Sequence, residues 1–233
     1  YLVARMARQH VTVSLSGDAG DELFGGYSRY VRGLQFARME SIPSSLRGAA
    51  AWTLGQIPGV QSAASRSLLR KVYWASTLLA SSSFEEAYRL MVSAWKEPLA
   101  AVDSEAIASS AFEEIPSRLV GASPLRRMMA IDTMTYLPDD ILVKVDRTTM
   151  AVSLESRAPF LDHRISEFAC RLPESMLMQS GQGKQILRKL LARYVPTSLT
   201  DRPKQGFGIP VDRWVRGPLL DWAESLLEPR LLA

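Results

Sequence analysis

Three carboxylates crowd into a short glycine-rich stretch near the start of the chain. The stretch reads Leu-Ser-Gly-Asp-Ala-Gly-Asp-Glu-Leu-Phe-Gly-Gly-Tyr over residues 15–27, and its acids are Asp18, Asp21 and Glu22. Like charges this close together are unfavourable unless a cation lies among them. Because hard oxygen ligands beside a phosphate are typical of Mg²⁺, the pattern predicts phosphate and magnesium chemistry. The acidic first turn of a solvated helix, which the helix dipole favours, explains these acids equally well.

The residues before this stretch predict the element that positions it. Residues 11–15, Val-Thr-Val-Ser-Leu, alternate in polarity and are rich in β-branched side chains, as strands are. A strand that leads through a glycine-rich turn into a helix is a common arrangement for binding phosphate or metal. This is the only convincing strand in the sequence. A single strand of parallel type needs partners for its hydrogen bonds, so we expect those partners to be encoded upstream.

Most of the remaining chain has the apolar spacing of helices. A helix is expected after Gly26, two or three weaker helices in residues 41–82, and a helix whose capping box is Ser83 to Glu86. Further helices are expected from Ser123 to near Pro138, from Asp162 to Leu172, and over residues 183–194 and 217–227.

Four blocks of the sequence together resemble one known family. Residues 15–27 resemble the second conserved block of the asparagine synthetase domain, which occurs in glutamine-hydrolysing asparagine synthetases and their β-lactam synthetase relatives. Residues 136–162 resemble the central helical segment of that domain, and residues 183–188 and 202–207 resemble its C-terminal blocks. The blocks follow the family's order and together span most of the chain.

The resemblance implies a fold class. The chain should be mainly α with one or few strands, as the C-terminal part of an α/β, Rossmann-like adenine-nucleotide domain of the PP-loop ATPase type. We expect residues 1–233 to be the C-terminal portion of the synthetase domain, with 41–122 as a variable helical lobe. The family's pyrophosphate loop, Ser-Gly-Gly-x-Asp-Ser, and its N-terminal glutaminase cysteine do not occur in these 233 residues. We therefore expect this chain alone to be inactive.

The resemblance also implies a reaction, the formation of a C–N bond by a ligase. Family members use ATP and Mg²⁺ to convert a carboxylate to an acyl-adenylate, and ammonia then displaces AMP. Here aspartate would become asparagine through β-aspartyl-AMP, with ammonia from glutamine supplied by an N-terminal glutaminase domain. A paralogous amidotransferase and a β-lactam synthetase-like ligase are the enzymatic alternatives. A non-catalytic helical interaction module is the alternative of another class, although it would have no need of Asp18, Asp21 and Lys204.

Individual residues receive roles from the same resemblance. Asp21 matches the family's magnesium-binding acid, and Asp18 matches an acidic position that steers the intermediate or relays the ammonium proton. The backbone N–H groups of Ser16, Gly17 and Gly20 are expected to contact the nucleotide phosphate or ribose. Glu22 is expected to support the loop structurally.

Two further assignments each keep an alternative. Lys204 matches the lysine that stabilises the adenylylation transition state; otherwise it is an ordinary surface lysine. Glu155 matches a member of the Tyr–Glu acid/base dyad of β-lactam-forming relatives; otherwise it is structural, in a buried ion pair with Arg157 or Lys144. Some members of a nearby charged cluster are expected to line the substrate carboxylate or ammonium pocket: Asp139, Asp140, Lys144, Asp146 and Arg147.

Charge and composition narrow the choice of partners. The net charge of +4 arises from 28 basic and 24 acidic side chains, and residues 184–216 hold much of the excess. A basic segment suits a polyphosphate substrate, although a solvated helix face is the plainer explanation. No base-stacking aromatics alternate with these charges, so we expect no nucleic-acid partner. No apolar run is long enough to span a membrane. A homodimer is one possible assembly of the protein.

The single cysteine, Cys170, excludes an intrachain disulfide and suits a reducing compartment, so we expect a cytoplasmic protein. Cys170 lies in the apolar pattern of Ile165, Phe168, Ala169 and Leu172, which predicts a buried thiol. His10 and His163 have no companions at zinc-ligand spacing, so no zinc site is expected.

Overall fold

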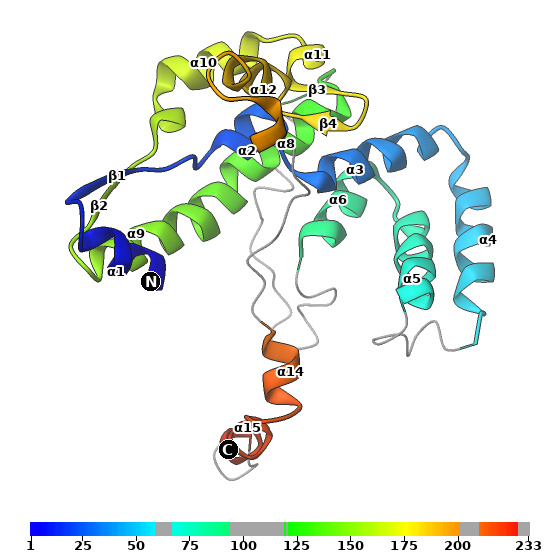
Figure 1. The fold of residues 1–233 in the computed structure, drawn as a ribbon. Helices are drawn as coiled ribbons and strands as arrows, with labels where there is room; N and C mark the ends of the chain where they lie inside the picture. The colour runs from blue at the N-terminus through cyan, green and yellow to red at the C-terminus, as the bar shows by residue number, and fades with distance from the viewer. Residues whose placement is uncertain (59–66, 94–118, 120, 201–209, 228–233) are drawn as a thin grey trace. The chain divides into compact units, whose positions relative to one another are not determined.

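The computed structural model describes residues 1–58, 67–93, 119, 121–200 and 210–227 (Figure 1). The chain divides into two compact units, Tyr1–Leu191 and Ala192–Ala233. In the second unit the described helices are α13 (Thr197–Thr200), α14 (Val211–Val215) and α15 (Leu220–Leu226). No helix within the described ranges is long and apolar enough to cross a membrane.

The first unit is mainly helical, as expected. Its described α-helices are α1 (Leu2–Arg8), α2 (Gly20–Phe24), α3 (Ser28–Met39), α4 (Ser44–Gly55), α5 (Ser67–Ala80), α6 (Phe84–Val92), α8 (Pro124–Met134), α9 (Val143–Met150), α10 (His163–Arg171), α11 (Glu174–Leu177) and α12 (Gln185–Leu191). The 3-10 turn η3 (Pro159–Leu161) precedes α10. α4 and α5 pack against each other in the range predicted to be a lobe, whereas α6 contributes to the core. The lobe boundaries at 41 and 122 stay predictions.

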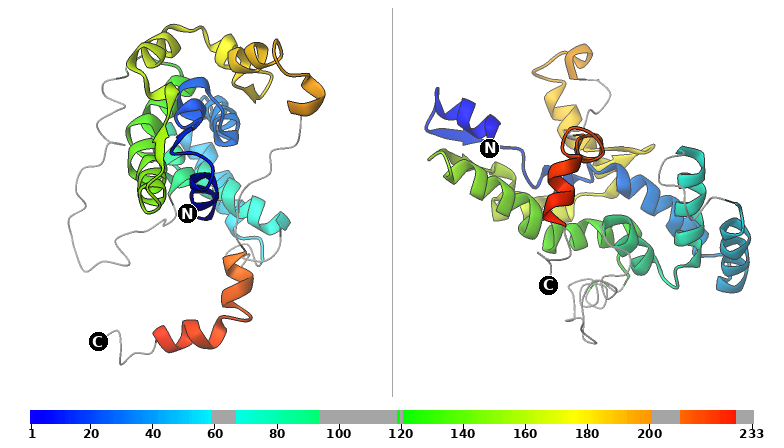
Figure 2. Two further views of the ribbon diagram at one scale, coloured as in Figure 1. Left: turned by 60° about the vertical axis from the view of Figure 1, so that its left-hand side comes forward. Right: turned by 90° about the horizontal axis from the view of Figure 1, so that it is seen from below.

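Three predicted helix starts are confirmed by their capping hydrogen bonds. Ser83 accepts from the backbone N–H of Glu86, Ser123 from that of Arg126, and Asp162 from that of Arg164. The helix that begins at Ser123 does not stop near Pro138, because the π-helix η2 (Leu137–Leu142) carries the chain on into α9. Figure 2 shows α8, η2 and α9 as one long helical path, drawn in green.

The predicted strand exists but has its partner within this chain. β1 (Val13–Leu15) pairs in parallel with β2 (Glu155–Arg157), with Val13 opposite Glu155 and Leu15 opposite Arg157. The expectation of a single strand with all its partners upstream is therefore wrong. The sequence does not predict β2, because Glu-Ser-Arg lacks the β-branched side chains by which strands are recognised. A short antiparallel hairpin, β3 (Met178–Gln179) with β4 (Gln182–Gly183), lies before α12.

The core of the first unit forms where α2, α3, α6 and α8 meet. Its fully buried side chains include Tyr30, Phe84, Tyr88, Leu125, Met128, Ile131 and Leu177. α3 and α8 approach closely at Gly33, where any side chain would collide with the sulfur of Met128.

The prediction of a buried Cys170 is wrong, because its thiol is exposed. α10 buries the adjacent Ala169. Since each residue of an α-helix turns by about 100° relative to the last, Cys170 falls outside the buried stripe.

Candidate active site

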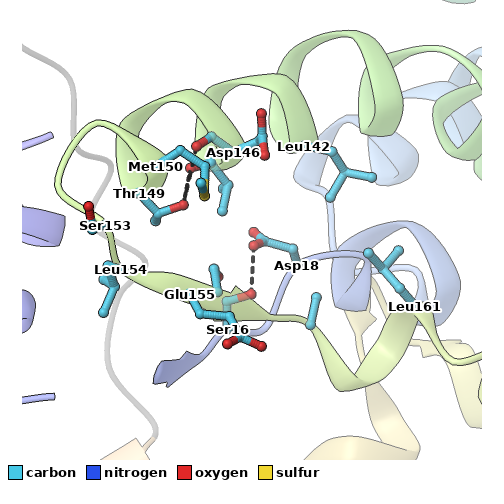
Figure 3. Close-up of a pocket in the computed structure, with 13 residues that line it drawn as sticks. Ser16, Asp18, Leu142, Asp146, Thr149, Met150, Ser153, Leu154, Glu155 and Leu161 are labelled. Atoms are coloured by element: carbon cyan, nitrogen blue, oxygen red, sulfur yellow. Dashed lines mark hydrogen bonds between the residues drawn. The ribbon is translucent and has the colours of Figure 1, made fainter. Parts of the chain in front are cut away.

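A cavity of about 540 Å³ lies where β1, β2 and α9 converge (Figure 3). Its polar lining residues are Ser16, Asp18, Asp146, Thr149, Ser153, Glu155 and Ser156, and its apolar ones are Leu142, Val145, Met150, Leu154, Ala158 and Leu161. The parallel pairing of β1 with β2 brings Ser16 and Asp18, which follow β1, close to the lining residues of the range 142–161. Three residues singled out from the sequence, Ser16, Asp18 and Glu155, thus meet in one pocket.

Asp18 lies at the turn that follows β1, and its side chain is half-buried. The hydroxyl of Ser16 donates a hydrogen bond of 2.7 Å to Asp18 Oδ2. Figure 3 shows the Asp18 carboxylate reaching into the space between the strands and α9. A carboxylate held at one oxygen keeps acceptor capacity on the other, so Asp18 can bind a cationic or hydrogen-bond-donating ligand there.

Asp21 lies in the first turn of α2 and is not among the residues that line this pocket. Its Oδ1 is 3.2 Å from Nζ of Lys184, which lies between β4 and α12. Both side chains cover the Cα atom of Gly26, where a methyl group would collide with each of them. Part of the positive charge that the acidic stretch requires therefore comes from the chain itself.

The position of Lys184 follows from backbone contacts between the β3–β4 hairpin and the end of α2. Its N–H donates to the carbonyl of Phe24 at 2.9 Å. Gly183 lies so close to the carbonyl of Gly25 that any side chain at position 183 would collide with it. Lys184 itself adopts a left-handed conformation with φ of 58°. Strained backbone of this kind persists only where the surrounding structure enforces it.

Glu22, the third acid, points into the core rather than toward the other two. Its side chain is 2% exposed, and Oε1 accepts a 2.6 Å hydrogen bond from the hydroxyl of Tyr27. Burial raises the pKa of Glu22, and the hydrogen bond from Tyr27 opposes that rise. Glu22 has the structural role expected of it. Over the described residues, no group of three or more His, Cys, Asp or Glu side chains could hold a metal ion.

A buried polar network, which the sequence did not predict, supports α3 beside these residues. One oxygen of Asp132, Oδ2, accepts hydrogen bonds from Arg29 Nε at 3.0 Å, Arg29 Nη2 at 2.8 Å and the hydroxyl of Tyr88 at 2.7 Å. The Arg29 guanidinium also lies 3.8 Å from the ring centroid of Tyr27 and 4.6 Å from that of Tyr136. Burial opposes the charge on Arg29, but the Asp132 carboxylate outweighs it and raises the Arg29 pKa. The sequence does contain one indication of this network, because Asp132 is an acid within the apolar stripe of α8.

Glu155 is exposed and pairs with Arg157 at 2.7 Å, with both side chains more than half exposed. The expectation of a buried ion pair at Glu155 is therefore wrong. Residues two apart in a strand share a face, and in β2 this face is the exposed one. Lys144 pairs instead with Asp140 at 3.4 Å. Of the predicted charged cluster, Asp146 is the member that lines the pocket.

Two of the three backbone N–H groups expected to meet a nucleotide already have partners. Ser16 N–H donates to the carbonyl of Arg157 at 2.8 Å, and Gly20 N–H donates to the carbonyl of Gly17 at 3.1 Å. Gly17 is exposed, and a side chain added there would meet no atom within 4 Å. The space open to a ligand is therefore at Gly17. Lys204 lies outside the described residues.

Comparison with known proteins identifies the family. The family model described as asparagine synthase matches residues 1–233. The chain belongs to the asparagine synthase family. It is 36% identical over 226 residues to a provisionally named glutamine-hydrolysing asparagine synthetase of Mycobacterium tuberculosis strain H37Rv, covering 96% of this chain and 34% of that protein. It is 32% identical over 234 residues to glutamine-hydrolysing asparagine synthetase 1 of Bacillus subtilis strain 168, covering 98% and 35%.

This member of the asparagine synthase family spans about a third of the length of the curated relatives it matches. No solved structure matches the chain. Its mainly helical architecture with few strands agrees with part of an asparagine synthase domain.

Proposed function

We propose that this chain carries part of the synthetase site of a glutamine-hydrolysing asparagine synthetase. The reaction is the ATP-dependent conversion of aspartate to asparagine through β-aspartyl-AMP, with ammonia produced from glutamine by a separate glutaminase domain. Membership of the asparagine synthase family supports this proposal. The observation that carries it is the pocket between β1, β2 and α9, in which the polar groups of Ser16 and Asp18 meet Glu155.

Asp18 is proposed to act in the amide-forming step. Among the described residues, the pocket lining contains the acids Asp18, Asp146 and Glu155 and no basic side chain. A negatively charged lining attracts ammonium. A positioned carboxylate can then accept a proton from the nitrogen. When the ammonia nitrogen attacks the acyl carbon, AMP leaves with the bonding pair, and the nitrogen must lose a proton. Asp18, oriented by Ser16, is the carboxylate proposed to accept it.

Asp21 is proposed as one ligand of Mg²⁺. Magnesium usually binds proteins through one or two carboxylates together with substrate phosphates. A single carboxylate in the first turn of α2 fits that kind of site, and the ion pair of Asp21 with Lys184 supports the proposal that a positive charge is favourable there. When bound, the metal would neutralise polyphosphate charge during adenylation. Gly17 and Lys204 are the proposed contacts of the nucleotide from this chain.

The proposal is tested in the full-length protein that contains this chain, with ammonia supplied directly so that the glutaminase is bypassed. Asp18→Asn is expected to lower asparagine formation by about 10²- to 10⁴-fold, the usual contribution of general acid–base catalysis. Aspartate-dependent release of pyrophosphate should fall much less, because adenylation precedes the attack of ammonia. Glu167→Gln removes an acid of α10 that is outside the pocket and is the matched control.

Two results would contradict the proposal. If aspartate does not stimulate pyrophosphate release by the unaltered protein, the substrate assignment is wrong, and another acyl substrate must be sought. If Asp18→Asn forms asparagine as fast as Glu167→Gln, the role given to Asp18 is wrong.

A further inference from the structure

A second cavity, of about 770 Å³, lies between α3 and α5 and shares no lining residue with the pocket described above. α3 contributes Arg32, Gln35, Phe36 and Met39, and α5 contributes Lys71, Trp74, Ala75, Leu78 and Leu79. Pockets for small organic ligands usually measure about 300–1,000 Å³. The volume therefore suits a ligand of ordinary metabolite size.

The cavity is built from one face of each helix. The contributing positions recur at spacings of three and four residues, which places them on a single side of an α-helix. Phe36 of α3 is 3% exposed, and Leu78 of α5 packs against the hydrophobic core. Trp74 adds a large aromatic surface to the same wall. The cavity thus offers apolar surface from both helices to any molecule that enters it.

The described charged groups that line this cavity have the same sign. Arg32 on α3 and Lys71 on α5 line it, and no acidic side chain of the described ranges does. Among the described residues, neither Arg32 nor Lys71 forms an ion pair. The neighbouring Arg29, by contrast, is paired with Asp132. Two cations beside apolar walls, with no carboxylate paired to them in the part of the chain that the structure describes, favour an anion.

An adjoining small cavity extends the same space. It measures about 130 Å³ and shares Arg32, Trp74 and Leu78 with the larger one. Met91 of α6 also lines it. A ligand that fills the main cavity can therefore place an apolar substituent against α6 as well.

We propose that the cavity between α3 and α5 binds a small amphipathic anion, a molecule with a carboxylate, sulfonate or phosphate group on an apolar, preferably aromatic, body. The anionic group pairs with Arg32 and Lys71, and the body lies against Phe36, Trp74 and Leu78. This site is independent of the function proposed for the pocket at β1 and β2.

Two fluorescent probes with the same rings separate the two parts of this proposal. The anion 1-anilinonaphthalene-8-sulfonate carries a sulfonate, whereas N-phenyl-1-naphthylamine is uncharged. Both are titrated into the full-length protein, and saturable binding of the anion to the unaltered protein is expected. In the double variant Arg32→Gln with Lys71→Gln, the Kd for the anion should rise about tenfold or more, because two charge-assisted contacts are lost. The Kd for the neutral probe should change less than about threefold, since the apolar walls remain.

One further variant removes a charge outside the cavity, and another fills the cavity itself. Arg38→Gln removes an exposed arginine of α3 that does not line the cavity, and it should leave binding of both probes unchanged. Ala75→Phe places a ring where Ala75 lines the cavity and should weaken both probes together. Circular dichroism and thermal melting verify that each variant is folded.

The proposal is overturned by any of three results: no saturable binding of the anionic probe, equal effects of Arg38→Gln and of the double variant, or insensitivity of both probes to Ala75→Phe. Parallel loss of both probes in the double variant would also overturn it, because the two cations would then act on folding rather than on the anion. None of these results bears on asparagine formation, which is measured separately.

Discussion

The buried pair of Arg29 and Asp132 provides the sharpest test of how α3 is held in place. Asp132 is 1% exposed and Arg29 is 21% exposed. Removing one partner of a buried ion pair costs about 3–5 kcal/mol, because the other charge is left without compensation. Asp132→Leu leaves the partly solvated Arg29 unpaired, so we expect the lower end of that range, about 3 kcal/mol. Arg29→Met leaves a carboxylate with almost no access to water, so we expect the upper end, about 4–5 kcal/mol.

The double variant is expected to be more stable than the sum of the single changes indicates. With both charges gone, no unpaired charge is buried, and replacement of such pairs by apolar groups is often close to neutral. We expect its total cost to be about 3 kcal/mol or less, with the loss of the contacts from Arg29 to the rings of Tyr27 and Tyr136 as the main component.

Urea denaturation of the three variants, followed by circular dichroism, measures these values. For a protein of this size, a loss of about 3 kcal/mol lowers Tm by roughly 6–12 °C, which a thermal melt checks independently. If the single costs add within about 0.5 kcal/mol in the double variant, the two residues do not interact. The account of the buried network would then be wrong.

Three other predictions concern residues around the acidic stretch and the nucleotide. Burial raises the pKa of Glu22, so the stability that its protonated form contributes is present below the unfolded pKa and is lost as pH rises through the folded pKa. Glu22→Gln, which can still accept the hydrogen bond from Tyr27, should therefore raise the free energy of unfolding more at pH 8 than at pH 4; equal effects in urea titrations at the two pH values would contradict this. In the full-length protein, Asp21→Asn should abolish pyrophosphate release while glutamine hydrolysis persists, because a metal contributes several kcal/mol to charge stabilisation; near-normal synthesis would exclude Asp21 as a ligand. Lys204→Ala should lower the adenylation rate at saturating ATP by about 10²- to 10³-fold, with incomplete rescue by Lys204→Arg, and a rise in the KM for ATP alone would show a ground-state role instead.

Local features of this fold could be predicted from the sequence, because the interactions that create them join neighbouring residues. Ser83, Ser123 and Asp162 each cap a helix by accepting from an N–H two or three positions ahead. The order of residue types in the sequence predicts a hydrogen bond that spans so few positions. The strand at β1 was recognised for the same reason, from its own alternating composition.

Features that depend on distant partners were missed or misjudged. The pairing of Asp21 with Lys184 joins two segments of opposite charge, but many basic residues could have supplied that cation. One interpretation of Glu155 was a buried ion pair with Arg157 or Lys144. The pair with Arg157 exists but is exposed, and nothing in the neighbouring sequence indicates that this face of β2 is exposed. The family resemblance predicts which residues are candidates for the site, and the tertiary contacts decide which of these candidates lie together.

The pairing of β1 with β2 has a consequence for the biogenesis of the pocket. Ser14 in β1 and Glu155 in β2 are 141 positions apart. At a rate of synthesis of about 5–20 residues per second, β2 therefore leaves the ribosome roughly 7–28 s after β1. Until then, Asp18 has no opposite wall, and the pocket is incomplete. The entropy of closing such a loop grows only with the logarithm of its length, about 0.6 kcal/mol for each doubling. A change in the length of the intervening chain, outside the pocket lining and the core, therefore costs little closure entropy. A shift of one residue in β2, by contrast, would turn its side chains to the opposite face.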